Sequence, residues 1–216
     1  MKSPHRLFYL TDRLEFPPVE TANSEGLLAV GGDLSVERLV LAYTNGIFPW
    51  FNEESPILWW SPDPRMVLYP DKVKISKSMR KVLRDNRFRL TKNTCFQQVL
   101  EHCSSIEREG QDGTWITQNM KKAYCAMHEK GYATSYEVWE QNELVGGLYG
   151  IDLGHIFCGE SMFSLTSNAS KFAFIKLAED LRAKGYKAID CQLYTAHLAS
   201  LGAQEMPRDK FMELLK

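Results

Sequence analysis

A single carboxylate stands inside an apolar stretch of this chain, where a charged group could do chemistry. Glu160 falls within residues 157–164, whose Phe, Cys and Met side chains favour a half-buried strand. A carboxylate there must be paired or face a cavity, because burying a lone charge is costly. Gly159 beside it is typical of a strand position that a ligand or another backbone approaches closely. A solvated sheet-edge glutamate is the alternative, and this stretch alone leaves both interpretations open.

A second polar pair follows further along the chain. Asp190 and Gln192 lie two residues apart in an apolar strand predicted over residues 187–192, so both side chains should leave the same face of the sheet. Sites in α/β sheets usually lie at strand ends. If this strand neighbours that of Glu160, three polar groups meet at one pocket. That pocket would be lined by Leu148, Phe157 and Met162. The alternative is that Asp190 and Gln192 simply cap neighbouring loops.

Other kinds of catalytic centre have little support in the sequence. The five cysteines are odd in number and form no CxxC pair, which indicates a reducing compartment rather than a disulfide framework. The histidines show no metal-ligand spacing, and no GxSxG motif is present. A Cys–His enzyme is disfavoured because strand alternation should point Cys191 away from the Asp190 and Gln192 face. We therefore expect no metal and no cofactor.

The pattern of strands and helices around these residues predicts an α+β fold. Residues 134–140, 144–151, 155–164 and 187–192 have the pattern of strands, and a helix after Asn168 connects the last two. Pro62 and Pro64 interrupt the chain before this region. We therefore place a domain junction near residue 62. A small N-terminal α/β domain would cover residues 1–62 and a larger domain would cover residues 63–216.

A helix predicted over residues 75–85 carries a row of positive charges. Lys77, Arg80, Lys81 and Arg84 fall at i, i+3, i+4 and i+7, so all four project from one outer stripe. A solvated helix face is the common explanation of such a row. The formal net charge of the chain is only −1, so any contact with nucleic acid must be local. A phosphate backbone is the partner that this stripe favours.

Tryptophans mark a further possible nucleic-acid contact. Trp50, Trp59 and Trp60 cluster closely, and most of them should form a small aromatic core. One exposed ring could stack on a base, which is worth about 1–3 kcal/mol. Trp50 and Trp115, the latter just ahead of a predicted helix, are the candidates. No apolar run approaches the roughly 20 residues of a membrane span, and the N-terminus has no signal-like apolar region. We expect a cytoplasmic protein.

Several motifs of this chain, in this order, resemble those of the leucyl/phenylalanyl-tRNA–protein transferases. The motifs are GIFPWF at residues 46–51, LWWSPDPR at 58–65, GTWIT at 113–117, FCGESMFS at 157–164 and IDCQ at 189–192. The similarity extends from about residue 16 to residue 207. It implies a small N-terminal domain joined to a mixed-sheet domain with the topology of the GNAT acyltransferases. It also implies transfer of Leu or Phe, and less readily Met, from aminoacyl-tRNA to proteins that begin with Arg or Lys.

The resemblance assigns roles to residues at the matching positions. Gln192 would hold the attacking amine, Asp190 would polarise Gln192, and Glu160 would face an ammonium group of one substrate. The pocket for the transferred side chain would be lined by Leu148, Phe157, Gly159 and Met162. The terminal adenosine would be flanked by Trp50, Trp115 and Tyr124. The acceptor stem would be bound by Lys77, Arg80, Lys81 and Arg84. The resemblance also implies that the modified proteins enter the bacterial N-degron pathway.

One position departs from the family pattern, and two alternatives remain. Thr195 stands where an asparagine is expected, and its shorter reach puts a substrate contact there in doubt. An acetyl-CoA-dependent N-acetyltransferase would need a glycine-rich turn for the pyrophosphate, and residues 164–170 contain no glycine. A non-catalytic tRNA-binding module would have no use for Glu160, Asp190 and Gln192 together.

Overall fold

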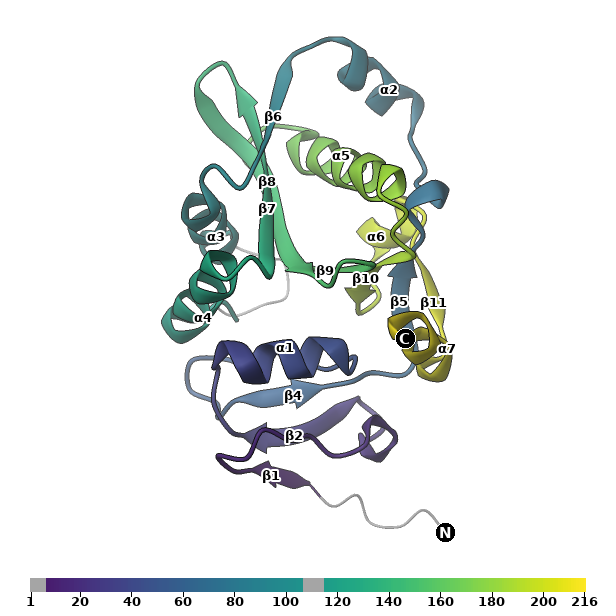
Figure 1. The fold of residues 1–216 in the computed structure, drawn as a ribbon. Coiled ribbons are helices and arrows are strands. Elements are labelled where there is room, and N and C mark those ends of the chain that lie inside the picture. The colour runs from purple at the N-terminus through teal and green to yellow at the C-terminus, as the bar shows by residue number, and fades with distance from the viewer. Residues whose placement is uncertain (1–6, 107–114) are drawn as a thin grey trace.

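The computed structural model describes residues 7–106 and 115–216, which form two β-sheets with helices around them (Figure 1). The smaller sheet has the strand order β1-β2-β4-β3, and the larger has the order β11-β5-β10-β9-β8-β7-β6. Strands of the smaller sheet come from the first part of the chain. Every strand of the larger sheet begins at or after Arg65. The domain boundary near residue 62 stays a prediction, and it falls between the last strand of one sheet and the first strand of the other.

The smaller sheet supports one helix on the side that faces the larger sheet (Figure 1). Its strands are β1 (Phe8–Leu10), β2 (Leu27–Gly31), β3 (Phe48–Pro49) and β4 (Leu58–Trp60), and helix α1 spans Val36–Thr44. A short 3-10 turn, η1 (Val19–Thr21), precedes β2. Ser35 caps α1, because its side chain accepts the backbone N–H of Arg38.

The larger sheet is mixed. Its strands are β5 (Arg65–Leu68), β6 (Phe88–Lys92), β7 (Ala133–Glu140), β8 (Glu143–Asp152), β9 (Ile156–Ser164), β10 (Ala188–Gln192) and β11 (Gln204–Met206). The pair β9–β10 is parallel, and the other pairs in this sheet are antiparallel. A parallel pair needs a crossover connection, and helix α5 (Ala169–Ala183) supplies it. The predicted α+β class, with a mixed sheet in the larger part, is confirmed.

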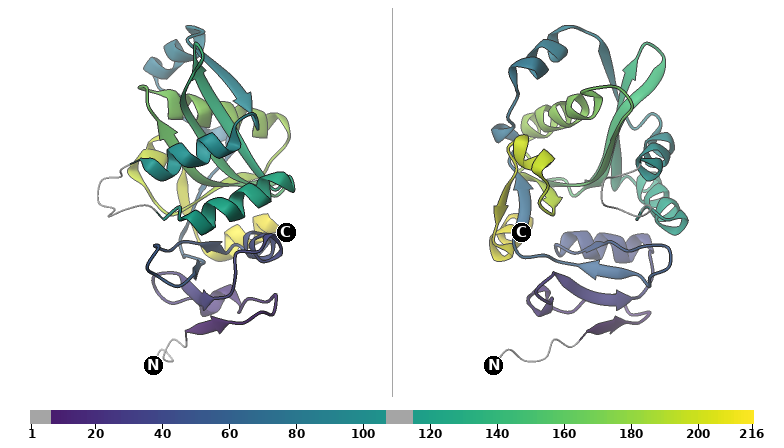
Figure 2. Two further views of the ribbon diagram at one scale, coloured as in Figure 1. Left: turned by 90° about the vertical axis from the view of Figure 1, so that its left-hand side faces the viewer. Right: turned by 180° about the vertical axis from the view of Figure 1, so that it is seen from behind.

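Helices cover both faces of the larger sheet (Figures 1 and 2). Helices α3 (Phe96–Ser105) and α4 (Gln118–Glu129) lie on one face, and α5 lies on the other with α2 (Lys77–Arg84) beside it. The 3-10 turn η2 (Pro70–Lys72) precedes α2. After β10 come the short α6 (Ala196–Ser200) and the C-terminal α7 (Arg208–Leu215), which packs against the end of α1 at Gly46. No helix within residues 7–106 and 115–216 is long and apolar enough to cross a bilayer.

The buried core is continuous between the two sheets. One apolar cluster joins Leu28 and Trp59 of the smaller sheet to Tyr124 and Met127 of α4. A second cluster lies on the other face of the larger sheet, under α5. Because the first cluster contains residues of both sheets, the smaller sheet is held to the larger one by buried side chains as well as by the connecting chain.

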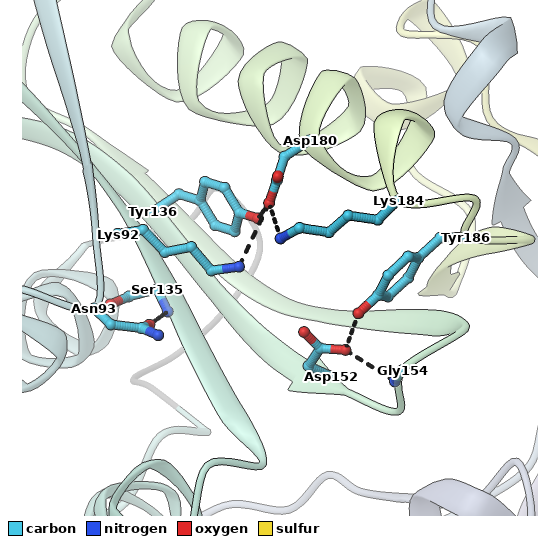
Figure 3. A network of polar contacts seen from close by, with 9 residues as sticks. All are labelled: Lys92, Asn93, Ser135, Tyr136, Asp152, Gly154, Asp180, Lys184 and Tyr186. Atoms are coloured by element: carbon cyan, nitrogen blue, oxygen red, sulfur yellow. Dashed lines mark hydrogen bonds and ion pairs between the residues drawn. The ribbon is translucent and has the colours of Figure 1, made fainter.

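A polar network fixes the position of α5 on the sheet (Figure 3). Asp180 of α5 accepts hydrogen bonds from Tyr136 of β7, from Lys184 at 2.7 Å and from Lys92 of β6 at 3.4 Å. Tyr186, just beyond the helix, donates to Asp152 of β8 at 2.6 Å. These contacts tie both the helix and its exit to the sheet. They matter for function because the same helix presents two apolar side chains to the cavity described next.

Candidate active site

A cavity of about 400 Å³ opens between strand β3 of the smaller sheet and strands β9 and β10 of the larger one. Most of its lining is apolar, and Phe174 and Leu177 of α5 close one side. The cavity brings together residues from the predicted catalytic, side-chain-binding and adenosine-binding sets. These are Trp50, Trp115, Leu148, Gly159, Glu160, Met162 and Gln192. Concave, mostly apolar cavities with a few polar groups are the usual form of a ligand site.

Glu160 is half-buried and lines this cavity. Its Oε1 accepts a hydrogen bond of 2.8 Å from Nε2 of Gln192, and its Oε2 accepts one of 2.7 Å from the Tyr124 hydroxyl. Desolvation raises the pKa of Glu160 from its usual value to about 7, and the hydrogen-bonding side chains of Tyr124, Tyr43 and Gln192 work against that rise. The interpretation as a solvated sheet-edge residue is therefore wrong, because the carboxylate is inside a pocket and paired with neutral donors.

Tyr124 has a different place from the one that the resemblance implies. Its side chain is fully buried, its hydroxyl is 2.9 Å from that of Tyr43, and it does not line the cavity. Desolvation, followed by the charge of Glu160, raises the pKa of both phenols, so both stay protonated. The structure places Tyr124 away from the cavity lining, and its contact with the adenosine stays a prediction. The ring instead supplies a hydrogen-bond donor behind Glu160.

Asp190 is fully buried in an ion pair with Arg65 of β5. Arg65 Nε lies 2.8 Å from Oδ1 and Nη2 lies 2.6 Å from Oδ2, a bidentate geometry that only arginine offers. Oδ1 also accepts the backbone N–H of Gln192 at 2.9 Å. The predicted polarising contact with the side-chain amide of Gln192 is not formed, since Asp190 contacts the backbone of that residue. Asp190 is also absent from the lining of the cavity.

The pairing of β10 with β5 shifts register between Asp190 and Gln192. Gln192 has a φ of 60°, which is uncommon for a residue with a side chain. The prediction that Asp190 and Gln192 share one open face is therefore wrong. It assumed a regular strand, whereas β10 is irregular between these two residues. Cys191, expected to point away, lines the cavity instead. Burial raises the pKa of its thiol, so a reactive thiolate is disfavoured as the sequence also indicated.

The apolar wall differs from the predicted set at Phe157. Leu148, Gly159 and Met162 line the cavity, but Phe157 does not. Phe157 is fully buried in the apolar cluster beneath α5, whereas Met162 packs against the same cluster and is only partly buried. Phe174, Leu177 and Ile189 complete the wall. Sequence reasoning missed these three because their helical or strand spacing is that of ordinary core residues.

The two remaining candidate aromatic residues lie on the cavity. Trp50 follows β3 and is half-buried, and its ring meets that of Trp60 edge-on at 5.7 Å. Trp115 is 8% exposed and lies just ahead of α4, whose cap residue Thr117 accepts the N–H of Met120. Residues 113 and 114, the first two of that motif, lie outside the described residues. The two rings therefore belong to one site although they are far apart in sequence.

Two other predicted groups lie at or beyond the rim. Thr195 is exposed, lines the cavity and caps α6 through a hydrogen bond from the N–H of Leu198. The stripe forms on α2, and all four of its residues are exposed: Lys77, Arg80, Lys81 and Arg84. Helix α2 lies at the end of the larger sheet that is remote from the smaller sheet (Figure 1). The structure thus separates the basic stripe from the residues around Glu160.

These features define an α+β protein whose apolar cavity carries a carboxylate–amide pair on one wall. The model of the family described as leucyl/phenylalanyl-tRNA protein transferase matches residues 67–216. The model of that family's N-terminal domain matches residues 32–63. The chain belongs to the leucyl/phenylalanyl-tRNA–protein transferase family, and its class is that of the aminoacyltransferases. The two alternatives weighed from the sequence find no support in this match.

Bacterial relatives of the same family match almost the whole chain. The leucyl/phenylalanyl-tRNA–protein transferase of Flavobacterium johnsoniae is 60% identical over 97% of this chain and 99% of its own. That of Christiangramia forsetii is 56% identical over 97% of this chain and 100% of its own. Among solved structures, a GCN5-related N-acetyltransferase from Kribbella flavida is 8% identical and overlaps with a TM-score of 0.35 over 78% of this chain and 59% of its own. That overlap is too weak to carry an argument.

Proposed function

We propose that this protein transfers Leu or Phe, and less readily Met, from aminoacyl-tRNA to the α-amine of proteins that begin with Arg or Lys. It acts in the cytoplasm, and its products enter the N-degron pathway. The observation that carries the proposal is the pairing of Glu160 with Gln192 on the wall of an apolar cavity. Such a cavity accepts an apolar side chain, while the polar pair meets the amines that the reaction brings together.

The proposed reaction needs only that the protein position the α-amine against the aminoacyl ester and that one proton move from the amine to the leaving group. The α-amine attacks the carbonyl carbon of the aminoacyl ester, a C–N bond forms, and the ester C–O bond breaks. The proton that the amine loses ends on the released ribose hydroxyl. Because the ester is already activated, holding the two groups in attack geometry supplies most of the acceleration. Neither ATP nor a metal ion enters this balance.

Gln192 is the residue proposed to hold the attacking amine. Its Nε2 donates to Glu160 at 2.8 Å, and this leaves the amide oxygen to accept an N–H of the amine. A neutral amide is a poor base, so Gln192 orients the amine rather than removing its proton. Glu160 supplies a negative charge beside it, which favours an ammonium group of one substrate.

The apolar wall is proposed to select the transferred amino acid. Leu148, Met162, Phe174, Leu177 and Ile189 line the cavity, and Gly159 leaves one stretch of strand β9 without a side chain. Adding a Cβ at Gly159 would meet the Asp190 carbonyl only at 3.7 Å, so the glycine adds room without being sterically required. A wall of this kind separates amino acids by shape, at about 1–3 kcal/mol per methylene group.

The remaining candidates are proposed to hold the tRNA. Trp50 and Trp115 would flank the terminal adenosine, and stacking contributes about 1–3 kcal/mol per base. The α2 stripe would contact phosphates of the acceptor stem. None of its four side chains takes part in an ion pair among the described residues. A few phosphate contacts give a modest affinity that falls with salt and does not depend on base sequence.

The direct experiment follows radiolabelled leucine from charged tRNA into a peptide. We expect labelling of a peptide that begins with Arg, and none of a peptide that begins with Glu. The same Arg peptide with an acetylated α-amine is the matched control, because it keeps the side chain and loses the nucleophile. Transfer to the Glu peptide would contradict the acceptor assignment. Absence of transfer to either peptide would contradict the proposed reaction.

A separate experiment tests the stripe. Replacing Lys77, Arg80, Lys81 and Arg84 with Glu should raise KM for charged tRNA at least about tenfold, because each lost phosphate contact weakens binding. Transfer from a short aminoacyl-adenosine analogue should change less than about twofold, since that substrate has no stem. The analogue is thus the internal control for folding. Equal losses on both substrates would show that the stripe does not bind the stem.

A further inference from the structure

Arg65 is a buried cation that contacts three separate parts of the chain. Its guanidinium pairs with Asp190 through two hydrogen bonds, and its Nη1 donates to the Gly46 carbonyl at 3.1 Å. The same group lies 4.8 Å from the ring centres of both Phe48 and Phe211. Only 1% of the Arg65 side chain is exposed. The residue therefore joins β5 and β10 of the larger sheet to the end of α1, β3 and α7.

The partner of Arg65 does not reach the cavity. Both oxygens of Asp190 are engaged by Arg65, and Oδ1 additionally accepts the N–H of Gln192. Asp190 is fully buried and is not part of the cavity lining. The hydrogen bond from the backbone N–H of Gln192 is therefore the direct contact between Asp190 and a residue of the cavity wall.

That backbone is held in an uncommon conformation. Gln192 has a φ of 60°, in the left-handed region where a side chain is disfavoured by about 1 kcal/mol or more. It lies at the shift of register between β10 and β5. The bond from Gln192 N–H to Asp190 fastens this conformation, and the side chain then reaches Glu160. Arg65, Asp190, Gln192 and Glu160 thus form one continuous chain of contacts.

We propose that Arg65 is a positioning residue for the transfer reaction. It fixes the Asp190 carboxylate, Asp190 fixes the backbone N–H of Gln192, and the Gln192 amide is thereby aimed into the cavity. In this arrangement Asp190 works as a clamp on the backbone and takes no part in moving the proton. The inference rests on the proposed function, because it concerns how Gln192 receives the attacking amine.

Arg65→Lys is the first variant that tests the proposal. Lysine keeps the positive charge but cannot bond both carboxylate oxygens and the Gly46 carbonyl in one plane. We expect kcat to fall about 10- to 100-fold, KM for both substrates to change less than about threefold, and the dependence of kcat on pH to keep its midpoint. A wild-type kcat in a folded Arg65→Lys protein would overturn the proposal.

Arg38→Lys is the matched control. Arg38 is also fully buried, and it also bonds an aspartate, Asp33, and a backbone carbonyl, that of Thr11. It belongs to α1 beside the smaller sheet and does not line the cavity. This variant should lower the melting temperature while kcat stays within about twofold of wild type. An equal fall of kcat in both variants would show that the Arg65 effect is general loosening of the fold.

The double variant Arg65→Gln/Asp190→Asn distinguishes two roles for Asp190, holding the backbone of Gln192 or carrying a proton. The asparagine introduced at position 190 retains an oxygen that can accept the Gln192 N–H, and the pair leaves no unmatched buried charge. A clamp predicts that kcat stays within about tenfold of wild type and still depends on pH. Loss of more than about a thousandfold, or disappearance of the pH dependence, in a protein that still melts cooperatively would overturn the proposal.

A measurement on the wild-type protein covers the case in which the variants fail to fold. The backbone amide of Gln192 should exchange its hydrogen as slowly as buried strand amides, because its acceptor is the buried Asp190. Exchange at the rate of an exposed loop amide would overturn the clamp. This readout does not depend on activity. A wild-type protein that fails to transfer leucine would instead count against the proposed function.

Discussion

Two glutamates of the larger sheet differ sharply in how their carboxylates are satisfied. Glu137 of β7 is fully buried and accepts four hydrogen bonds. Three of these come from hydroxyls, those of Thr91, Thr94 and Ser135, and one comes from the backbone N–H of Thr94. Glu160 of β9 accepts hydrogen bonds from Tyr124 and Gln192, has the Tyr43 hydroxyl nearby, and lines the cavity. Glu137 therefore has its lone pairs occupied by the protein, whereas Glu160 has room for a further donor.

The difference separates a carboxylate that supports the fold from one that is available to a ligand. Glu137 holds the chain just ahead of α3 to β6 and β7, and its four donors offset the cost of burying the charge. Burial raises the pKa of Glu160 to about 7, even though its hydrogen bonds act to lower that pKa. A positively charged group that enters the cavity would complete the shell of Glu160. Removing each carboxylate should therefore disturb a different property of the protein.

Glu137→Ala should have the largest effect, and that effect should be on stability. The change leaves the Thr94 N–H and several hydroxyls buried without their acceptor, which costs about 3 kcal/mol of unfolding free energy. Denaturant unfolding measures this loss. At low temperature, where the variant is folded, kcat for leucine transfer should stay within about threefold of wild type. A stable variant without activity would reverse the roles assigned to the two glutamates.

Glu160→Gln should have the next largest effect, and it should be on catalysis. The amide keeps the shape and can still accept from Tyr124, but it carries no negative charge to meet an ammonium group. We expect kcat/KM to fall about 100-fold, equivalent to about 2.7 kcal/mol. Glu143→Gln, at an exposed position of β8, is the matched control and should behave as wild type. An unchanged kcat/KM in Glu160→Gln would mean that Glu160 is as structural as Glu137.

The stability of Glu160→Gln should also depend on pH in a definite direction. A carboxyl whose pKa is raised from its usual value to about 7 on folding favours the folded state while protonated. That contribution is complete below about pH 4.5 and is lost as pH rises to about 7. Glutamine does not titrate. The melting temperature of the variant relative to wild type should therefore rise between about pH 5 and pH 8, and a constant difference would contradict the raised pKa.

Sequence patterns identified Glu160 and Gln192 as site residues but could not distinguish Glu160 from Glu137. Glu160 is a candidate because it interrupts an apolar strand, and that argument leaves a cavity position and a solvated sheet edge both open. Glu137 interrupts a strand in the same way between Tyr136 and Val138, yet Thr and Ser side chains of the sheet satisfy it. Which donors surround a buried acid is decided by the pairing of strands that are distant in sequence. Local pattern does not contain that information.

Irregular backbone explains most of the remaining differences. The shift of register at Gln192 placed Asp190 and Gln192 in different surroundings, although strand alternation predicts a shared face. Arg65 was missed even though it opens the otherwise apolar strand β5, which is the same signal that identified Glu160. Tyr43 and Tyr124 gave no signal of their place behind Glu160, since a tyrosine on the inner face of a helix is usually an ordinary core residue.

Tyr124→Phe should have the smallest effect. It removes one hydrogen-bond donor from Glu160 and so increases the difference in hydrogen bonding between Glu160 and Glu137. The hydrogen bond from the Tyr124 hydroxyl lowers the pKa of Glu160, so its loss should raise that pKa above about 7. If transfer requires the ionised carboxylate, the rising limb of kcat against pH should shift to higher pH, and kcat at about pH 7 should fall about threefold. The acceptor amine titrates identically in both proteins, so comparison with wild type isolates Glu160. A shift to lower pH would show that the hydroxyl does not stabilise the charged form, and hydrogen-bond donors would then not explain how Glu160 differs from Glu137.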